Sequence, residues 1–480
     1  MLFCSTRDPV ARYSAAQAVA CGLSPEGGRF FPETLPVFSF DRILAMAAMR
    51  GPRVMQTVLA ELLPGFAESA LQEAVAAAWE TAGDPPPRPV RPGIWSAELF
   101  FGPTGTLHDL PMQVLVRLLP HAAKAAGLSE TPAALCASID AGRAALAAFA
   151  EEGGSVLAFF AEEETPSLTR RQAEALQDEG RRALTVQAGW DELRARVEKQ
   201  CVRQTSPERP LVWAGPDNWA WLAAQTARYF VLYAGLVRAE ALEGGEPVNL
   251  VLPCGGGHQL LAALTAKACG LPVGKILCAC QADSALPHFV QTGGWAPRAR
   301  ESACDPSLSP RIAPGLEQLL FFLTRDAAST AEKAALLKQT GTLPSDPAWA
   351  RAMEEAGVRA FLIDGQRRER AMEDLWQGRG VLTAPHTGLA AAALRQYAAL
   401  TGDKTPALWM ATASPFLFPE EVLPAMGLDF DGNDRQRLEA MEIVGGQSAP
   451  AFLKALPDGG EDSGSAVPPE ALYKIISELS

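Results

Sequence analysis

Short apolar runs alternate with longer alanine-rich stretches along the middle of the chain. Each run is short and ends at a Gly, Ser, Pro or polar residue, which is typical of a strand buried on both faces. The predicted strands cover residues 133–138, 155–160, 211–214, 248–252 and 275–280. The predicted helices that follow several of them cover residues 141–151, 219–240 and 258–269. Strands followed by helices indicate βαβ units, a mostly parallel sheet, and a site at the carboxyl ends of the strands.

The composition narrows the classes of function. Of the 480 residues, 48% are apolar and 20% are charged, so the chain can bury a sizeable core. The formal net charge of −13 argues against binding to a nucleic-acid backbone. The sequence holds no apolar run of about 18 residues, and residues 1–20 lack an apolar signal core. We therefore expect a cytoplasmic protein with neither a nucleic-acid partner nor a membrane span.

A set of short motifs occurs in a fixed order along most of the chain. The first are Ser5-Thr6-Arg7, Glu26-Gly27-Gly28, Pro32-Glu33, residues 98–104 (ELFFGPT) and Met112-Gln113. The later ones are Gly270-Leu271-Pro272, Thr292-Gly293, Pro385-His386-Thr387 and residues 411–415 (ATASP). This ordered set resembles threonine synthase, a fold-type-II pyridoxal-phosphate lyase of threonine biosynthesis, in register over about residues 1–425.

The resemblance implies an α/β fold similar to the tryptophan synthase β subunit, with mostly parallel sheets flanked by helices. Together with turn-rich breaks in the chain, it predicts four units. They are a threonine-synthase-type N-terminal segment (1–95), a small α/β domain (96–240), a large α/β domain (241–425) and a C-terminal extension (426–480). The extension is expected to hold an exposed linker over 456–469 and a short helix over 471–479.

The sequence departs from the family at the position of the catalytic lysine. The family's segment after GPT reads LAFKD, and its lysine forms the Schiff base with the cofactor. Here the segment runs from Gly105 to Asp109 and has His108 in the lysine position. An imidazole cannot form the imine that a primary amine forms with pyridoxal, so His108 is predicted to be non-functional as the catalytic residue. Pyridoxal 5′-phosphate is then expected to be lost, or held without a covalent bond.

The segments that resemble the family's phosphate-binding elements are also altered. The loop ATSGDTG corresponds to residues 136–142, where Ile139 stands at a glycine position. Trp221 stands at an arginine position and Leu417 at a lysine position. Such losses are expected to weaken phosphate binding by about 1.5–3 kcal/mol per charged hydrogen bond. The remaining candidates for substrate binding are Ser138, Asp140 and Gly142.

A glycine-rich loop survives between a predicted strand and a predicted helix. In the family the corresponding PTGNFGD loop binds the cofactor phosphate through backbone amides, and amides at a helix N-terminus favour an anion. Asp283, after the neighbouring strand, would repel such an anion. The candidate residues of the ancestral cofactor site are Gly255, Gly256, Gly257, His258 and Thr412.

The same positions suggest two other kinds of chemistry, a metal site and a thiol nucleophile. The resemblance places His108 and His258 in one cavity with His386 nearby, and three imidazoles would suit zinc. No HxxxH spacing supports this, so we predict no metal site. Cys254 beside His258 could be a thiol nucleophile, but the nine unpatterned cysteines are more typical of small buried residues in a reducing compartment.

The sequence therefore predicts a pseudoenzyme, which is a threonine synthase-like scaffold with a binding or regulatory role. Its partner would be a small anion, an amino acid or another protein, and it would be a monomer or a homodimer. The alternative is an active family lyase that converts O-phosphohomoserine to threonine and phosphate, or a diverged enzyme that uses the same cofactor.

Overall fold

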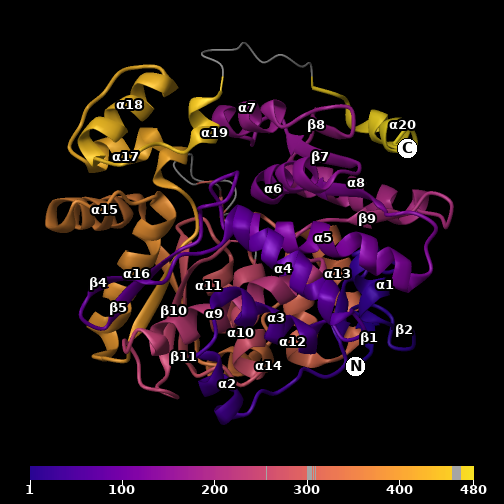
Figure 1. The fold of residues 1–480 in the computed structure, drawn as a ribbon, viewed down its shortest axis with the longest axis horizontal. Coiled ribbons are helices and arrows are strands. Elements are labelled where there is room, and N and C mark those ends of the chain that lie inside the picture. Colours follow the sequence, from indigo (N-terminus) through magenta and orange to yellow (C-terminus); the bar gives the residue numbers. More distant parts are fainter. Residues whose placement is uncertain (256, 300–304, 306–307, 309, 457–465, 480) are drawn as a thin grey trace.

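The computed structural model describes residues 1–480 except 256, 300–304, 306–307, 309, 457–465 and 480. It contains two mostly parallel sheets, with helices packed around them, and a small antiparallel sheet near the N-terminus (Figure 1). This α/β architecture is the one predicted from the sequence. Of the helices in the described part of the chain, none is long and apolar enough to span a membrane.

The larger sheet has six strands in the order β12-β11-β10-β13-β5-β4, and only the edge strand β4 is antiparallel to its neighbour. Its strands are β4 (Arg88–Arg91), β5 (Ile94–Glu98), β10 (Val248–Pro253), β11 (Val273–Gln281), β12 (Val358–Ile363) and β13 (Ala407–Ala411). The helices of this part are α10 (His258–Ala268), α11 (Leu286–Thr292), α14 (Pro347–Glu355), α15 (Gly365–Arg379) and α16 (Pro385–Thr401). Both faces of β10 are buried, because Val251 packs with residues of α16 whereas Leu250 and Leu252 pack into the main core.

The smaller parallel sheet has the strand order β8-β7-β6-β9. Its strands are β6 (Ala133–Ala137), β7 (Val156–Ala161), β8 (Arg181–Val186) and β9 (Leu211–Trp213), and its helices are α6 (Ile139–Glu152), α7 (Ser167–Ala175) and α8 (Trp190–Gln204). All four strands lie within residues 96–240, whereas β5 at the edge of that range pairs with β13 of the larger sheet. The division into four domains stays a prediction.

The N-terminal part consists of three antiparallel strands and four helices. They are β1 (Phe3–Ser5), β2 (Arg12–Tyr13), β3 (Phe30–Pro32), α1 (Ala15–Cys21), α2 (Phe40–Met46), α3 (Gly51–Leu62) and α4 (Glu68–Ala82). Four central helices complete the main core: α5 (Asp109–Ala126), α9 (Trp219–Arg238), α12 (Leu316–Thr324) and α13 (Ala327–Thr340). Helix α9 is buried along nearly its whole length, which its apolar residues on every face allow.

The C-terminal part lies beside α15 and beside the smaller sheet (Figure 1, yellow). It holds η2 (Pro415–Leu417), α17 (Pro419–Ala425), α18 (Asp434–Gly445), α19 (Ala451–Lys454), η3 (Pro469–Ala471) and α20 (Leu472–Ser477). Helix α20 packs against α8, and Val467 forms a parallel bridge with Val186 of β8. The predicted C-terminal helix is therefore present, while most of the predicted linker lies outside the described residues.

A buried ionic network ties the N-terminal part to the smaller sheet. Asp217, which is 0% exposed, accepts hydrogen bonds from Arg29 (Nε, 2.8 Å), Arg194 (Nη2, 2.6 Å) and the Trp213 indole (Nε1, 2.6 Å). Both arginines also bind Glu198. Burial alone raises the pKa of Asp217, but the guanidinium groups of Arg194 and Arg29 outweigh it and hold the pKa well below its usual range.

We predict that Asp217→Ala lowers the free energy of unfolding by about 3–5 kcal/mol, because it leaves buried guanidinium groups without their partner. Urea unfolding near neutral pH measures this loss. Since the folded-state pKa of Asp217 is lowered, its contribution is present above about pH 4, the ordinary aspartate value. That contribution is lost as the pH falls through the lowered pKa.

The matched control is Asp374→Ala, which removes a carboxylate from an exposed ion pair with Arg395. This change is expected to cost no more than about 0.5–1 kcal/mol. Equal losses for the two variants would contradict the structural role of the buried network.

Candidate functional site

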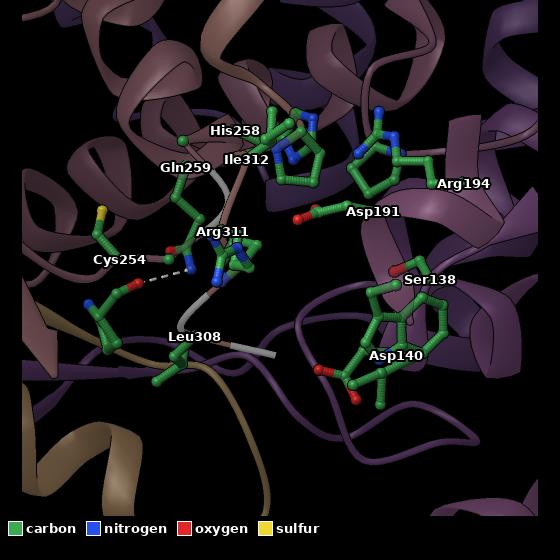
Figure 2. A pocket seen from close by; sticks show the side chains of 18 of the residues that line it. Ser138, Asp140, Asp191, Arg194, Cys254, His258, Gln259, Leu308, Arg311 and Ile312 are labelled. Atoms are coloured by element: carbon green, nitrogen blue, oxygen red, sulfur yellow. Dashed lines mark hydrogen bonds between the residues drawn. The ribbon is translucent and has the colours of Figure 1, made fainter. Parts of the chain in front are cut away.

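A cavity of about 340 Å³ lies where strands of both parallel sheets end. Its wall includes Ser138 after β6, Pro216 after β9, Asp283 after β11 and Thr412 after β13. Residues 253–255 and 257–259, at the end of β10 and the start of α10, also line it. This is the place that the βαβ pattern predicts, because the carboxyl ends of parallel strands gather side chains from several loops. Figure 2 shows Ser138 and Asp140 on one side of the cavity and Cys254 and Gln259 on another.

His108 reaches the cavity from the turn that precedes α5. The carboxylate of Asp109 holds this turn, because it accepts hydrogen bonds from the Thr104 hydroxyl (2.7 Å) and the Thr106 amide (3.2 Å). Burial raises the pKa of Asp109 to about 6, while the hydrogen bonds from Thr104 act against that rise. Arg228 of α9 donates to the carbonyl of Leu107 (2.7 Å), so the position of the backbone at His108 is fixed from two sides.

The surroundings of the His108 imidazole disfavour its protonated form on balance. It is half-buried, and its Nδ1 atom is shielded from solvent without a hydrogen-bond partner. Burial lowers the pKa of His108 to about 4, and nearby Asp140 offsets this only in part because Arg143 and Arg228 act in the opposite direction. His108 is therefore neutral near pH 7.

His258 begins α10 and lines the same cavity. Its Nε2 atom is buried and has no hydrogen-bond partner, and burial lowers the pKa of His258 to about 3 despite the charge of Asp217. The ring centroid of Trp221 lies 5.3 Å from that of His108 and 6.1 Å from that of His258. These three rings form a continuous cluster, which we call the ring cluster.

The glycine-rich loop makes the turn from β10 into α10. Gly257 caps α10 with φ at +79°, a left-handed conformation that favours glycine. Gly255 packs directly against the backbone of Leu308, since a Cβ added to it would lie 2.3 Å from the Leu308 carbonyl oxygen. Both glycines line the cavity, and the predicted site residue Gly256 lies outside the described residues.

The residues that resemble the family's phosphate loop are only partly at the cavity. Ser138 and Asp140 line it, and Asp140 forms an ion pair with Arg143. Gly142 does not line it, because it lies within α6 and packs against the ring of Phe160. The substituted residue Ile139 takes part in the wall.

His386 and Thr412 form a separate polar contact at the cavity wall. The two ring nitrogens of His386 lie within hydrogen-bonding distance of the Thr412 hydroxyl (3.0 Å) and of an Asp305 carboxylate oxygen (2.9 Å). The expected proximity of His108, His258 and His386 is confirmed to the extent that all three line one cavity. Among the described residues, however, no group of histidine, cysteine and carboxylate side chains is arranged to hold a metal ion.

Charged groups on the cavity wall are mostly carboxylates and arginines, and no lysine lines it. All lysines of the chain lie among the described residues, and none of them is on the cavity wall. The carboxylates are Asp140, Glu164, Asp191 and Asp283, and the arginines are Arg194, Arg298 and Arg311. Arg194 is already bound to Asp217 and Glu198, which reduces its capacity to bind an anion in the cavity.

Cys254 is a weak candidate for a nucleophile. It lines the cavity but is 1% exposed, and its thiol lies close to that of Cys278 of β11. This contact and burial raise the pKa of Cys278 well above its usual value. A buried thiol that contacts another buried thiol is typical of a structural residue.

Sequence reasoning did not identify Trp190, Asp191 and Arg194 as cavity residues. They lie in the first turns of α8, directly after strand β8. This strand is half-exposed and lacks the continuous apolar run by which the other strands of the smaller sheet can be recognised in the sequence. Once β8 is known to be parallel to β7, the start of α8 is expected at the edge of the sheet that carries the site.

Comparison with known proteins finds similarity to threonine synthases. The family model described as the threonine synthase N terminus matches residues 2–79. A threonine synthase of Pseudomonas aeruginosa is 24% identical over 432 residues, which cover 88% of this chain and 90% of that protein.

Solved structures show the same fold. The crystal structure of pyridoxal-phosphate-bound threonine synthase from Brucella melitensis matches with a TM-score of 0.79 and 22% identity, over 100% of this chain and 98% of that one. Threonine synthase from yeast matches with a TM-score of 0.81 and 19% identity, over the same shares of the two chains.

We predict that replacing His108 or His258 with glutamine makes the stability of the protein less sensitive to mild acid. Both folded-state pKa values lie below the value of about 6.5 for an unfolded histidine. As the pH falls below that value, the unfolded chain gains protons that the folded protein does not, and the folded state loses stability.

The free energy of unfolding, measured in urea near pH 7 and again near pH 5, tests this prediction. Each glutamine variant should lose less stability between the two pH values than the unchanged protein does. His121→Gln, on the exposed side of α5, controls for the substitution itself. An unchanged pH dependence in the His108 and His258 variants would contradict the assignment of neutral buried imidazoles.

Proposed function

We propose that this member of the threonine synthase family keeps the fold and the cavity of its relatives without their imine chemistry, and acts by binding a small molecule. The observation that carries the proposal is the identity of the residues around the cavity. His108 stands where the family resemblance expects the Schiff-base lysine, and no lysine elsewhere in the chain lines the cavity. A carbonyl compound in the cavity therefore meets no primary amine with which to form an imine.

The residues present do not fit pyridoxal phosphate as a covalently held cofactor. The nearest cavity groups at the lysine position are an imidazole and an indole. On the loop where the resemblance implies phosphate binding, the Leu308 backbone lies against Gly255. We therefore assign no reaction step to this cofactor and treat its loss as part of the proposal.

The chemistry of His108 supports a role in binding. In the family the lysine both carries the cofactor and moves protons, and an imidazole can do only the second. With its pKa near 4, His108 is neutral at physiological pH and can donate or accept one hydrogen bond at a ring nitrogen. A hydrogen bond to a ligand would provide the unpartnered Nδ1 atom with a partner.

An active threonine synthase is the second candidate, favoured by the long alignment with the Pseudomonas aeruginosa enzyme. It would convert O-phosphohomoserine to threonine and phosphate. Against it stand His108 and the substituted residues Ile139 and Trp221, all of which line the cavity. Loss of a covalent catalytic group costs several orders of magnitude in rate. The expectations of a cytoplasmic location and of a monomer or homodimer remain part of this proposal.

We predict that the purified protein forms no imine with pyridoxal phosphate. The measurement is absorbance between about 410 and 430 nm, the range of the protonated imine of this cofactor, followed by borohydride reduction and peptide mass analysis. The expected result is no band and no cofactor fixed to a lysine. A stoichiometric product on one lysine would refute the proposed function.

We also predict that His108→Lys alone does not restore formation of threonine from O-phosphohomoserine. Ile139 and Trp221 still occupy the cavity wall, and groups that act together in one site contribute non-additively. Released phosphate and threonine are assayed with the variant and with the unchanged protein. Turnover within about tenfold of a typical enzyme rate of ~10 s⁻¹ would show that the remaining substitutions matter little.

A further inference from the structure

We propose that the cavity binds a small uncharged aromatic compound that carries both a hydrogen-bond donor and a hydrogen-bond acceptor, as an aromatic amide does. This inference rests on the proposed function, because it names the class of ligand that the cavity takes. The residues that carry it are Thr412, His386 and the ring cluster, all of which line the cavity.

Thr412 adjoins the ring cluster through the backbone. Its carbonyl oxygen accepts a hydrogen bond from the amide of Leu107 (2.8 Å), which is the residue before His108. The His108 ring in turn contacts the ring of Trp221. Thr412, His108 and Trp221 are therefore consecutive parts of one stretch of cavity wall, against which a single small ligand can pack.

The charges around this stretch of wall compensate one another. The ionisable groups that act on His108 each contact a group of the opposite kind, an acid against a base. The pairs are Asp140 with Arg143, Asp84 with Arg228, and Asp305 with His386. Elsewhere on the wall, Asp191 lies near both Arg194 and Arg311. A charged ligand placed against His108 loses its water without gaining an unpaired counter-charge, so desolvation favours an uncharged one.

The hydroxyl of Thr412 has its proton committed to His386. The carboxylate of Asp305, whose backbone is bound at both its amide and its carbonyl by Gln281, only accepts hydrogen bonds, so the His386 Nε2 atom at 2.9 Å carries a proton. In the neutral imidazole the Nδ1 atom is then an acceptor, and it takes its hydrogen bond from the Thr412 hydroxyl (3.0 Å). The Thr412 oxygen therefore accepts a hydrogen bond from a ligand instead of donating one.

The ring cluster has the opposite requirement. The Nε1 atom of the Trp221 indole can only donate, and no group among the described residues accepts from it. The His108 Nδ1 atom likewise has no partner in the described part of the chain. Buried polar atoms are normally paired, so a ligand that brings an acceptor to the rings and a donor to Thr412 satisfies both sides of this wall.

The rest of the wall favours a flat, apolar body for the ligand. The indoles of Trp190, Trp213 and Trp221 line the cavity, together with the side chains of Ile139 and Ile312. Sites for small molecules are mostly apolar with a few polar groups that fix orientation, and aromatic rings pack well against one another. An aromatic ring that carries one amide group combines these features.

The test compares three compounds of similar shape: benzamide, methyl benzoate and benzoate. Benzamide has a donor and an acceptor, methyl benzoate has acceptors only, and benzoate is an anion without a donor. Titrations of the full-length protein followed by nuclear magnetic resonance are made at pH 8, above the usual histidine pKa of about 6.5. We expect benzamide to bind about tenfold more tightly than either of the other two, because only benzamide pairs with Thr412 without a charge.

Two variants assign this preference to its residues. Thr412→Val, which removes the accepting oxygen, should lower the affinity for benzamide to about that for methyl benzoate, whereas Thr412→Ser should keep the preference. Trp221→Phe, which keeps a ring but removes the Nε1 donor, should weaken benzamide and methyl benzoate alike. The matched control is Thr226→Val, because Thr226 is buried in α9 with its hydroxyl bound to the Leu222 carbonyl (2.8 Å) and does not line the cavity. It should leave all three affinities unchanged.

The inference is overturned if benzamide binds no more tightly than methyl benzoate, or if benzoate binds most tightly. It is also overturned if a folded Thr412→Val protein keeps the preference for benzamide. Circular dichroism establishes that each variant folds, and the comparison of the three compounds on the unchanged protein decides the matter even where a variant does not. Failure of the proposed function would appear elsewhere, as a lysine of the unchanged protein trapped with pyridoxal phosphate.

Discussion

The burial of one carboxylate constrains much of this structure. Asp217 lies in the turn between β9 and α9, where solvent cannot reach it, and its charge requires cationic partners. Arg29 comes from the N-terminal part and Arg194 from α8, while Gln318 of α12 donates to its carbonyl (3.0 Å). Three parts of the chain are therefore joined at the start of α9. Since Trp221 is four residues further along, the same contacts that neutralise this charge also orient the helix that presents the indole to the cavity.

That arrangement also determines the electrostatics of the cavity. Arg194 faces the cavity, yet its guanidinium is bound to Asp217 and Glu198 and contributes less positive charge to a ligand. His108 and His258 are neutral because burial lowers the pKa of each to about 4 and about 3. Carboxylates remain elsewhere on the wall. The cavity therefore combines neutral rings with carboxylates and with Arg298 and Arg311, and it lacks the lysine that the family resemblance expects at position 108.

Much of the fold could be predicted, since the strands buried on both faces are short apolar runs that local pattern can detect. Strands β6, β7, β9, β10 and β11 begin and end within two residues of their predicted bounds. Strand β8 (RRALTV) was missed because it is half-exposed and mixes charged with apolar residues. Strand β5 joins the larger sheet through β13, more than three hundred residues away, as with the pair Ile94 and Ala407. Such long-range pairing depends on tertiary packing, which no local pattern contains.

The candidate site, like the fold, could be predicted from the sequence only in part. Motif order placed His108, His258, Ser138, Asp140 and Thr412 near one cavity, but it could not reveal contacts between side chains from α5, α9 and α10. The contact of Trp221 with both imidazoles is of that kind, and it makes the substitutions at 108 and 221 physically compatible. A lysine at 108 would bury an ammonium near Arg143 and Arg228, whose charges already disfavour protonation of His108. A neutral imidazole avoids that repulsion and packs against an indole, so each of the two residues favours the presence of the other.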